Sequence, residues 1–157
     1  MKKLLVLSDS HGRKDLVKRT LDLHRKEFDW VFHLGDFSQD MFDYYGKEIK
    51  FYSVKGNMDP IFPRTDFFAE DEIFLTLENL RAWLVHGHQY EAHFSLEKML
   101  RKAKVKEINI VFYGHTHREF FQKIEDIYFF NPGALKSLSY GFIIIDNESV
   151  EAQFLKL

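Results

Sequence analysis

Short apolar runs alternate with amphipathic segments along the first third of the chain. Each apolar run is only a few residues long and stops at a polar residue or a glycine, which is typical of a buried parallel strand. The amphipathic segments place apolar side chains on one side of a helix and charges on the other. The order strand, helix, strand, helix, strand predicts right-handed crossovers and a parallel sheet. Strands are expected at residues 4–8, 30–34 and 49–55, and helices at 13–26 and 39–45.

The rest of the chain is dominated by strand-like runs, interrupted by one helical segment at 95–104. Adjacent apolar pairs such as Phe120-Phe121 indicate strands covered on both faces, because neighbouring strand residues point to opposite sides. Too few helices are expected to cover one broad sheet, so two sheets packed face to face are favoured. The fold class is therefore α/β (α+β), a four-layer α-β-β-α sandwich of two mixed β-sheets flanked by helices. The runs lie at residues 73–77, 80–85, 108–113, 120–124, 127–130, 140–145 and 150–155.

Length and composition limit the class of protein. A chain of 157 residues predicts a single domain, residues 1–157. With 22 basic and 24 acidic side chains the formal charge is −2, which excludes an overall basic nucleic-acid binder. Cysteine is absent, so disulfides and thiolate metal ligands are excluded. No apolar run approaches the roughly 18 residues of a membrane span, and the basic start turns polar too early for a signal peptide. A cytoplasmic protein is expected.

Polar residues of only a few types follow the predicted strands. In an α/β sheet the carboxyl ends of the strands form the crevice where ligands bind. Each motif alone is weak, since it also suits a turn or a surface histidine, but together they indicate one site. Oxygen and nitrogen donors at this density suit first-row divalent metals rather than Ca²⁺. The motifs are Asp9-Ser10-His11, Gly35-Asp36, Gly56-Asn57, His86-Gly87-His88 and Gly114-His115-Thr116-His117.

The number of donors favours two metal ions over one. Seven ligands are too many for a single ion that also keeps water. A carboxylate can bridge two ions about 3.5–4 Å apart, the usual arrangement of two-metal hydrolytic sites.

These motifs resemble those of the calcineurin-like metallophosphoesterases, from residue 2 to about residue 145. The small size and the Asn131-Pro132-Gly133 turn are similar to the compact YfcE-type phosphodiesterase branch. The resemblance implies the double-sheet sandwich and two divalent ions, Mn²⁺ ahead of Ni²⁺, Zn²⁺ or Fe. His86 is chosen over His88 because the family's histidine leaves its strand directly. The resemblance assigns one ion to Asp9, His11, Asp36 and His117, and the other to Asp36, Asn57, His86 and His115, with Asp36 bridging.

One position departs from the family pattern. Many larger members have a histidine directly after the asparagine, thought to protonate the leaving group, where this chain has Met58. Methionine has no proton to donate. Asp59 remains, and His88 and His93 are the candidate replacements. We predict Asp36, Asn57 and His88 as catalytic residues, and Asn57 and Arg13 as residues that bind substrate.

The expected activity is hydrolysis of small phosphodiesters by a metal-bridging hydroxide. Two divalent ions, the carboxylates of Asp9 and Asp36 and one hydroxide sum to +1, which a phosphodiester of charge −1 neutralises. Basic residues beside the motifs, such as Arg118, change this balance if they face the site. The alternative is a non-catalytic metal-bearing scaffold similar to the retromer subunit of this fold, but retention of every ligand position favours an enzyme. The expected partner is a small phosphate ester, with no membrane and no nucleic acid. The sequence does not fix the oligomeric state.

Overall fold

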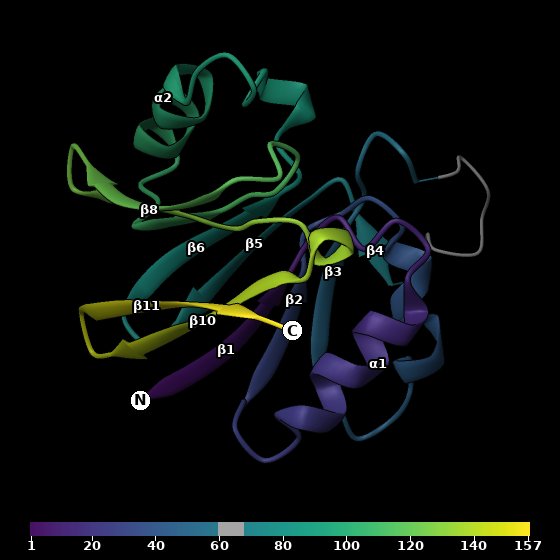
Figure 1. The fold of residues 1–157 in the computed structure, drawn as a ribbon. Coiled ribbons are helices and arrows are strands. Elements are labelled where there is room, and N and C mark those ends of the chain that lie inside the picture. Colours follow the sequence, from purple (N-terminus) through teal and green to yellow (C-terminus); the bar gives the residue numbers. More distant parts are fainter. Residues whose placement is uncertain (60–67) are drawn as a thin grey trace.

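The computed structural model describes residues 1–59 and 68–157, which form two mixed β-sheets (Figure 1). The first sheet has the strand order β11-β10-β1-β2-β3-β4, and the second has the order β5-β6-β7-β9-β8. The first sheet contains β1 (Lys2–Leu7), β2 (Trp30–His33), β3 (Phe51–Val54), β4 (Ala69–Glu70), β10 (Ser139–Asp146) and β11 (Ser149–Lys156). The second contains β5 (Glu72–Leu77), β6 (Leu80–Val85), β7 (Ile110–Phe112), β8 (Glu119–Ile124) and β9 (Ile127–Pro132).

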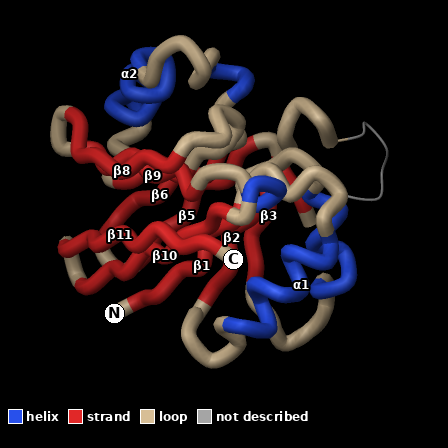
Figure 2. Tube along the Cα trace, in the orientation of Figure 1, coloured by secondary structure: helices blue, strands red, loops and turns tan. Residues whose placement is uncertain are grey.

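Helices cover the outer face of each sheet (Figures 1 and 2). Helix α1 (Lys14–Leu23) lies against the first sheet and α2 (Glu97–Val105) against the second. The segment expected to be helical at 39–45 is a 3₁₀ helix, η1 (Ser38–Tyr44), preceded by Phe37 in a left-handed conformation. Two shorter 3₁₀ turns are η2 (His88–Tyr90) and η3 (Leu135–Ser137). None of the helices in the described ranges is long and apolar enough to cross a membrane.

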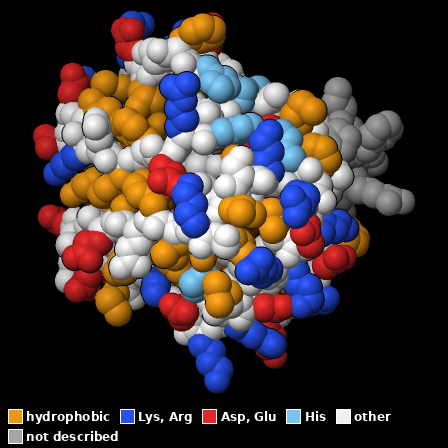
Figure 3. All heavy atoms as spheres, viewed as in Figure 1, with side chains coloured by type: hydrophobic (Ala, Val, Ile, Leu, Met, Phe, Trp, Pro, Cys, Tyr) orange, Lys and Arg blue, Asp and Glu red, His pale blue; other side chains and the backbone are white. Residues whose placement is uncertain are grey.

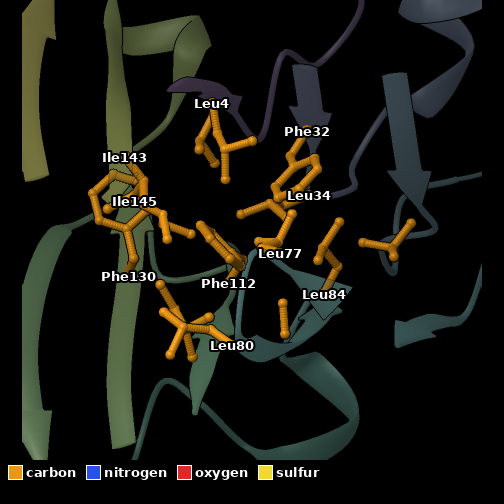
Figure 4. Close-up of a cluster of buried hydrophobic side chains, with 14 residues drawn as sticks. Leu4, Phe32, Leu34, Leu77, Leu80, Leu84, Phe112, Phe130, Ile143 and Ile145 are labelled. Carbon is orange, nitrogen blue, oxygen red and sulfur yellow. The ribbon is translucent and has the colours of Figure 1, made fainter. Parts of the chain in front are cut away.

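Three buried clusters separate the four layers and confirm the predicted sandwich. Between the sheets, Phe32, Phe112 and Phe130 pack together in the cluster of Figure 4. A second cluster joins α1 to the first sheet, and a third joins α2 to the second. Phe129 belongs to the third cluster, whereas its neighbour Phe130 belongs to the first. Adjacent apolar residues of one strand therefore do face opposite layers, as the sequence predicted.

The parallel strands of both sheets direct their carboxyl ends to one region. Strands β1, β2 and β3 are parallel, and so are β6, β7 and β9. The two sheets meet closely here, because His86 Nδ1 lies 2.6 Å from the carbonyl oxygen of Leu34. Gly35 permits this approach: a Cβ there would lie 2.7 Å from both His86 Nδ1 and the Gly56 nitrogen. The loops that carry the predicted ligands therefore come from both sheets and contact one another where the carboxyl ends of the strands meet.

Candidate metal centre

Four side chains from three loops converge on one point. Asp9 and His11 follow β1, Asp36 follows β2, and His117 follows β7. One ligand atom from each of the four lies within 4.8 Å of all the others. His117 Nε2 is 3.0 Å from Asp9 Oδ1, and His11 Nε2 is 3.2 Å from Asp36 Oδ2. These are the four residues that the resemblance assigned to the first ion, and they come from both sheets.

The second oxygen of Asp36 faces a second set of donors. Asp36 Oδ1 lies 3.4 Å from His86 Nε2, which is itself 3.1 Å from Asn57 Oδ1. The ring of His115 is 5.1 Å from the ring of His86, centre to centre. The backbone N–H of Met58 donates to Asp36 Oδ1 at 2.9 Å and so fixes the orientation of the carboxylate. Asp36 thus stands between two groups of donors and directs one oxygen to each.

The hydrogen bonds of His86 fix which of its ring nitrogens is available to a cation. His86 is fully buried, and its Nδ1 faces the Leu34 carbonyl oxygen, which only accepts. Nδ1 must therefore carry a proton, and in the neutral ring Nε2 has the lone pair. Histidine ligands are commonly oriented in this way by a backbone carbonyl. Nε2 points at the oxygens of Asp36 and Asn57, so all three atoms are suited to binding one cation.

The donor chemistry of the other predicted ligands also fits a divalent metal. Nε2 of His11 is buried and makes no hydrogen bond within the described ranges. Burial opposes ionisation of Asp9, but hydrogen bonds from His117 and Ser8 favour the carboxylate, and its pKa lies below the usual value. Burial lowers the pKa of His115 to about 4. An ionised carboxylate and a neutral imidazole are the forms that bind metals.

Five of the seven predicted ligands have a left-handed backbone. Such conformations are uncommon outside glycine, persist where the surrounding structure enforces them, and cluster at functional sites. The second oxygen of Asp9, for example, accepts hydrogen bonds from Ser8 Oγ and from the backbone N–H of His115. The φ angles are 53° for Asp9, 49° for His11, 56° for Asp36, 65° for His115 and 59° for His117.

Buried side chains that the sequence analysis missed hold the first of these loops in place. Ser10 Oγ donates to Asp40 Oδ2 at 2.7 Å and lies 2.9 Å from His33 Nε2. Asp40 also accepts the backbone N–H of Gly12 at 2.9 Å. Burial lowers the pKa of His33 to about 4, so the ring is neutral. No local sequence pattern predicts this role, because each of these residues contacts a partner on another element.

Asn131 holds the loop that carries His115 and His117. Its Nδ2 donates to the Gly114 carbonyl at 2.8 Å and to Thr116 Oγ1 at 3.0 Å. Its Oδ1 accepts the backbone N–H of Gly133 at 2.9 Å. The sequence indicated Asn131 only as part of a turn. In the structure its hydrogen bonds fix the loop that carries two predicted ligands.

The model of the calcineurin-like phosphoesterase superfamily domain matches residues 1–148. The chain belongs to this superfamily. Among curated relatives of this phosphoesterase, a probable metallophosphoesterase of Mycoplasma pneumoniae is 33% identical over 139 residues, covering 87% of this chain and 80% of the relative. A phosphodiesterase of Methanocaldococcus jannaschii is 24% identical over 143 residues, covering 83% and 82%. The resemblance seen in the sequence is confirmed.

Solved structures share the fold of this calcineurin-like phosphoesterase. A predicted phosphoesterase of Streptococcus pneumoniae superposes with a TM-score of 0.81 at 26% identity, covering 99% of this chain and 89% of its own. The zinc complex of Vps29 from Entamoeba histolytica superposes with a TM-score of 0.72 at 18% identity, covering 98% of each chain. The second similarity is one of fold alone.

The residues predicted to act in catalysis or substrate binding, other than the metal ligands, are His88 and Arg13, and only His88 lies beside the candidate metal centre. The ring of His88 is 5.4 Å from that of His86, and its buried Nδ1 has no hydrogen-bond partner in the described part of the chain. Arg13 is exposed at the start of α1, where its guanidinium makes two hydrogen bonds to Asp15. That ion pair directs Arg13 to a neighbouring surface carboxylate, so its role in substrate binding stays a prediction.

Met58 and Asp59 lie in the loop after β3 and contact different parts of the site. The Met58 side chain is 51% exposed and only its backbone contacts Asp36. Asp59 accepts backbone N–H groups from Ser38 and Gly56, both at 2.6 Å. Burial raises the pKa of Asp59, although these hydrogen bonds oppose the shift. Asp59 therefore fixes the loop that presents Asn57.

Proposed function

We propose that this calcineurin-like phosphoesterase is a dinuclear metal-dependent phosphodiesterase that acts on small substrates. The observation that carries the proposal is the position of Asp36, with one oxygen 3.2 Å from His11 Nε2 and the other 3.4 Å from His86 Nε2. A carboxylate between two donor sets is the arrangement that two-metal hydrolytic sites use. The two ions would be held by Asp9, His11, Asp36 and His117, and by Asp36, Asn57, His86 and His115.

Bound divalent ions would supply the Lewis acid that polarises the phosphoryl oxygens and lowers the pKa of a water molecule. The chain's own contribution is to hold the donors in their ionised or neutral forms. Asp9 is kept anionic by His117, and the proton of His86 is kept on Nδ1 by the Leu34 carbonyl. These contacts are made inside the protein before substrate arrives, so little reorganisation is needed during the reaction.

Asn57 and His88 are the residues we assign to the substrate. Asn57 is exposed and its Oδ1 faces His86, which leaves its Nδ2 to donate to a phosphate oxygen. His88 lies beside His86 and His115, with ring centres 5.4 and 6.0 Å away. Met58 supplies no proton, so substrates whose leaving group needs little protonation are expected to react fastest.

The balance of charge favours diesters over monoesters. Only two of the predicted ligands are carboxylates, so two divalent ions leave the centre positive enough for a monoanion. Methyl 4-nitrophenyl phosphate and 4-nitrophenyl phosphate have the same leaving group and differ by one charge. We expect kcat/KM to be about tenfold higher for the diester, which corresponds to about 1.4 kcal/mol. Steady-state kinetics at one pH test this, and a preference for the monoester would overturn it.

Metal binding is expected to stabilise the folded protein. A ligand at 100 times its Kd adds about 2.7 kcal/mol, which for a chain of this size raises Tm by roughly 5–10 °C. Chelator-treated protein titrated with Mn²⁺ in a thermal melt, with bound metal counted by elemental analysis, measures both the shift and the number of ions. His117→Ala should lose most of the shift, because His117 faces Asp9. His24→Ala should keep it, since His24 contacts Tyr140 and Glu27 instead. No shift with any first-row ion would contradict the proposal.

A further inference from the structure

A pocket borders the metal centre on the side of the loop after β7. It has a volume of about 320 Å³, and its lining includes His93, Phe94, Thr116 and Arg118. Thr116 lies between two predicted ligands, and the ring of His93 is 4.2 Å from the ring of His115, centre to centre. A group attached to a phosphate at the metal centre could therefore enter this pocket directly.

Phe94 is the most unusual side chain of the pocket. It is 88% exposed, the largest exposed fraction among the large hydrophobic side chains that the structure describes. Its backbone is nevertheless fixed, because the N–H groups of Phe94 and Ser95 both donate to the Glu91 carbonyl oxygen, at 2.9 and 3.3 Å. A rigid backbone thus presents an aromatic face to solvent beside the centre. Aromatic rings of this kind stack on planar groups of a ligand.

The charge of the pocket suits an anionic ligand. Arg118 directly follows His117, and its guanidinium makes no ion pair with the described residues. The carboxylate that lines the same pocket, Glu119, is neutralised by Lys156 at 2.6 Å and also accepts a hydrogen bond from Ser139 at 2.9 Å. The positive charge of Arg118 is therefore not cancelled locally. On the face drawn in Figure 3, basic side chains lie beside a group of histidines.

We propose that this pocket binds a planar aromatic substituent of the phosphate ester, with Phe94 stacked on its ring and Arg118 attracting its phosphate. The inference rests on the proposed function, because the ester must bind at the metal centre. A volume near 300 Å³ is at the lower end for ligand pockets and suits one base or aryl ring rather than an oligonucleotide. The chemical class is thus a nucleotide or aryl phosphate ester.

Calorimetry of the Mn²⁺-loaded protein with two matched ligands tests the pocket without relying on turnover. Adenosine 5′-phosphate and ribose 5-phosphate share the phosphate and the sugar and differ at C1 of the ribose, which carries adenine in one and a hydroxyl group in the other. We expect the wild type to bind adenosine 5′-phosphate about tenfold more tightly, the size of one base–aromatic stacking contact. Phe94→Ala should bring the ratio of affinities close to one, and Phe94→Trp should preserve it. Leu23→Ala, an exposed apolar residue on α1 at 60% exposure, should change neither affinity.

Turnover of methyl 4-nitrophenyl phosphate, measured on the same preparations, separates this inference from the proposed function. Turnover together with equal affinities for the two ligands would overturn the aromatic pocket and leave the phosphodiesterase standing. A Phe94-dependent preference without any turnover would support the pocket and contradict the phosphodiesterase. A preference that Phe94→Ala leaves intact would show that the base binds elsewhere, and would also overturn the inference.

Discussion

Asp36→Asn is expected to lower kcat/KM for methyl 4-nitrophenyl phosphate by about 10²–10³-fold, the loss seen when one group that stabilises the transition state is removed. The amide removes the negative charge and replaces one oxygen by an NH₂ group. That group would face either His11 Nε2 or His86 Nε2, since the carboxylate oxygens lie 3.2 and 3.4 Å from them. An NH₂ group cannot bind a cation, so bound metal should fall from two ions towards one. Elemental analysis and steady-state kinetics measure the two effects on the same sample.

Asp43→Asn is the matched control for this substitution. Asp43 lies in the segment just after Asp36, is exposed, and is 3.9 Å from Lys14 rather than near the centre. It should keep full activity and both ions. If Asp36→Asn behaved in the same way, Asp36 would not bridge two ions. If the wild type bound two ions tightly but hydrolysed no ester, the non-catalytic scaffold would become the better interpretation.

The layers of this fold could be predicted from sequence because both sheets are covered on both faces. Pairs such as Phe129-Phe130 divide between two clusters, and only a strand between two layers buries both members. The order of the strands could not be predicted. Strand β1 pairs with β10, so that Leu4 lies beside Ile143, and no local pattern specifies a contact between segments so far apart in the chain.

The same limit applies to the site. The candidate ligands could be chosen from the sequence because each follows a strand, and strand ends of parallel sheets meet at one edge. His33 was missed because it ends β2 as an ordinary strand residue, and only its contact with Ser10 reveals its role. Arg13 was chosen from its position two residues after His11. Its guanidinium binds the carboxylate of Asp15 in the structure, and a contact with substrate stays a prediction.

Gly114→Ala tests whether the close approach of the two sheets positions the centre, because it removes no donor atom. A Cβ at Gly114 would overlap Ser8 Oγ and lie 2.9 Å from Asp9 Oδ2. The backbone cannot withdraw easily, since its N–H donates to the His86 carbonyl at 3.0 Å and its carbonyl accepts from Asn131 at 2.8 Å. Ser8 must therefore move, and with it Asp9, whose Oδ2 accepts the hydrogen bond of Ser8 Oγ. A displacement of about 1 Å at a catalytic centre costs about 10²-fold in rate, and we expect a loss of that size in kcat/KM.

A second glycine separates this effect from a general loss of stability. Gly46 has a φ of +73°, and a Cβ added there would have no neighbouring atom within 4 Å, so Gly46→Ala strains the backbone without a clash. It should lower the free energy of unfolding by about 1 kcal/mol and leave kcat/KM unchanged. Gly114 has no such φ, so its alanine variant acts through the contact with Ser8 and Asp9 alone. Full activity of Gly114→Ala with two bound ions would show that the centre tolerates a shift of Asp9. The close packing of the strand ends would then serve the fold rather than the chemistry.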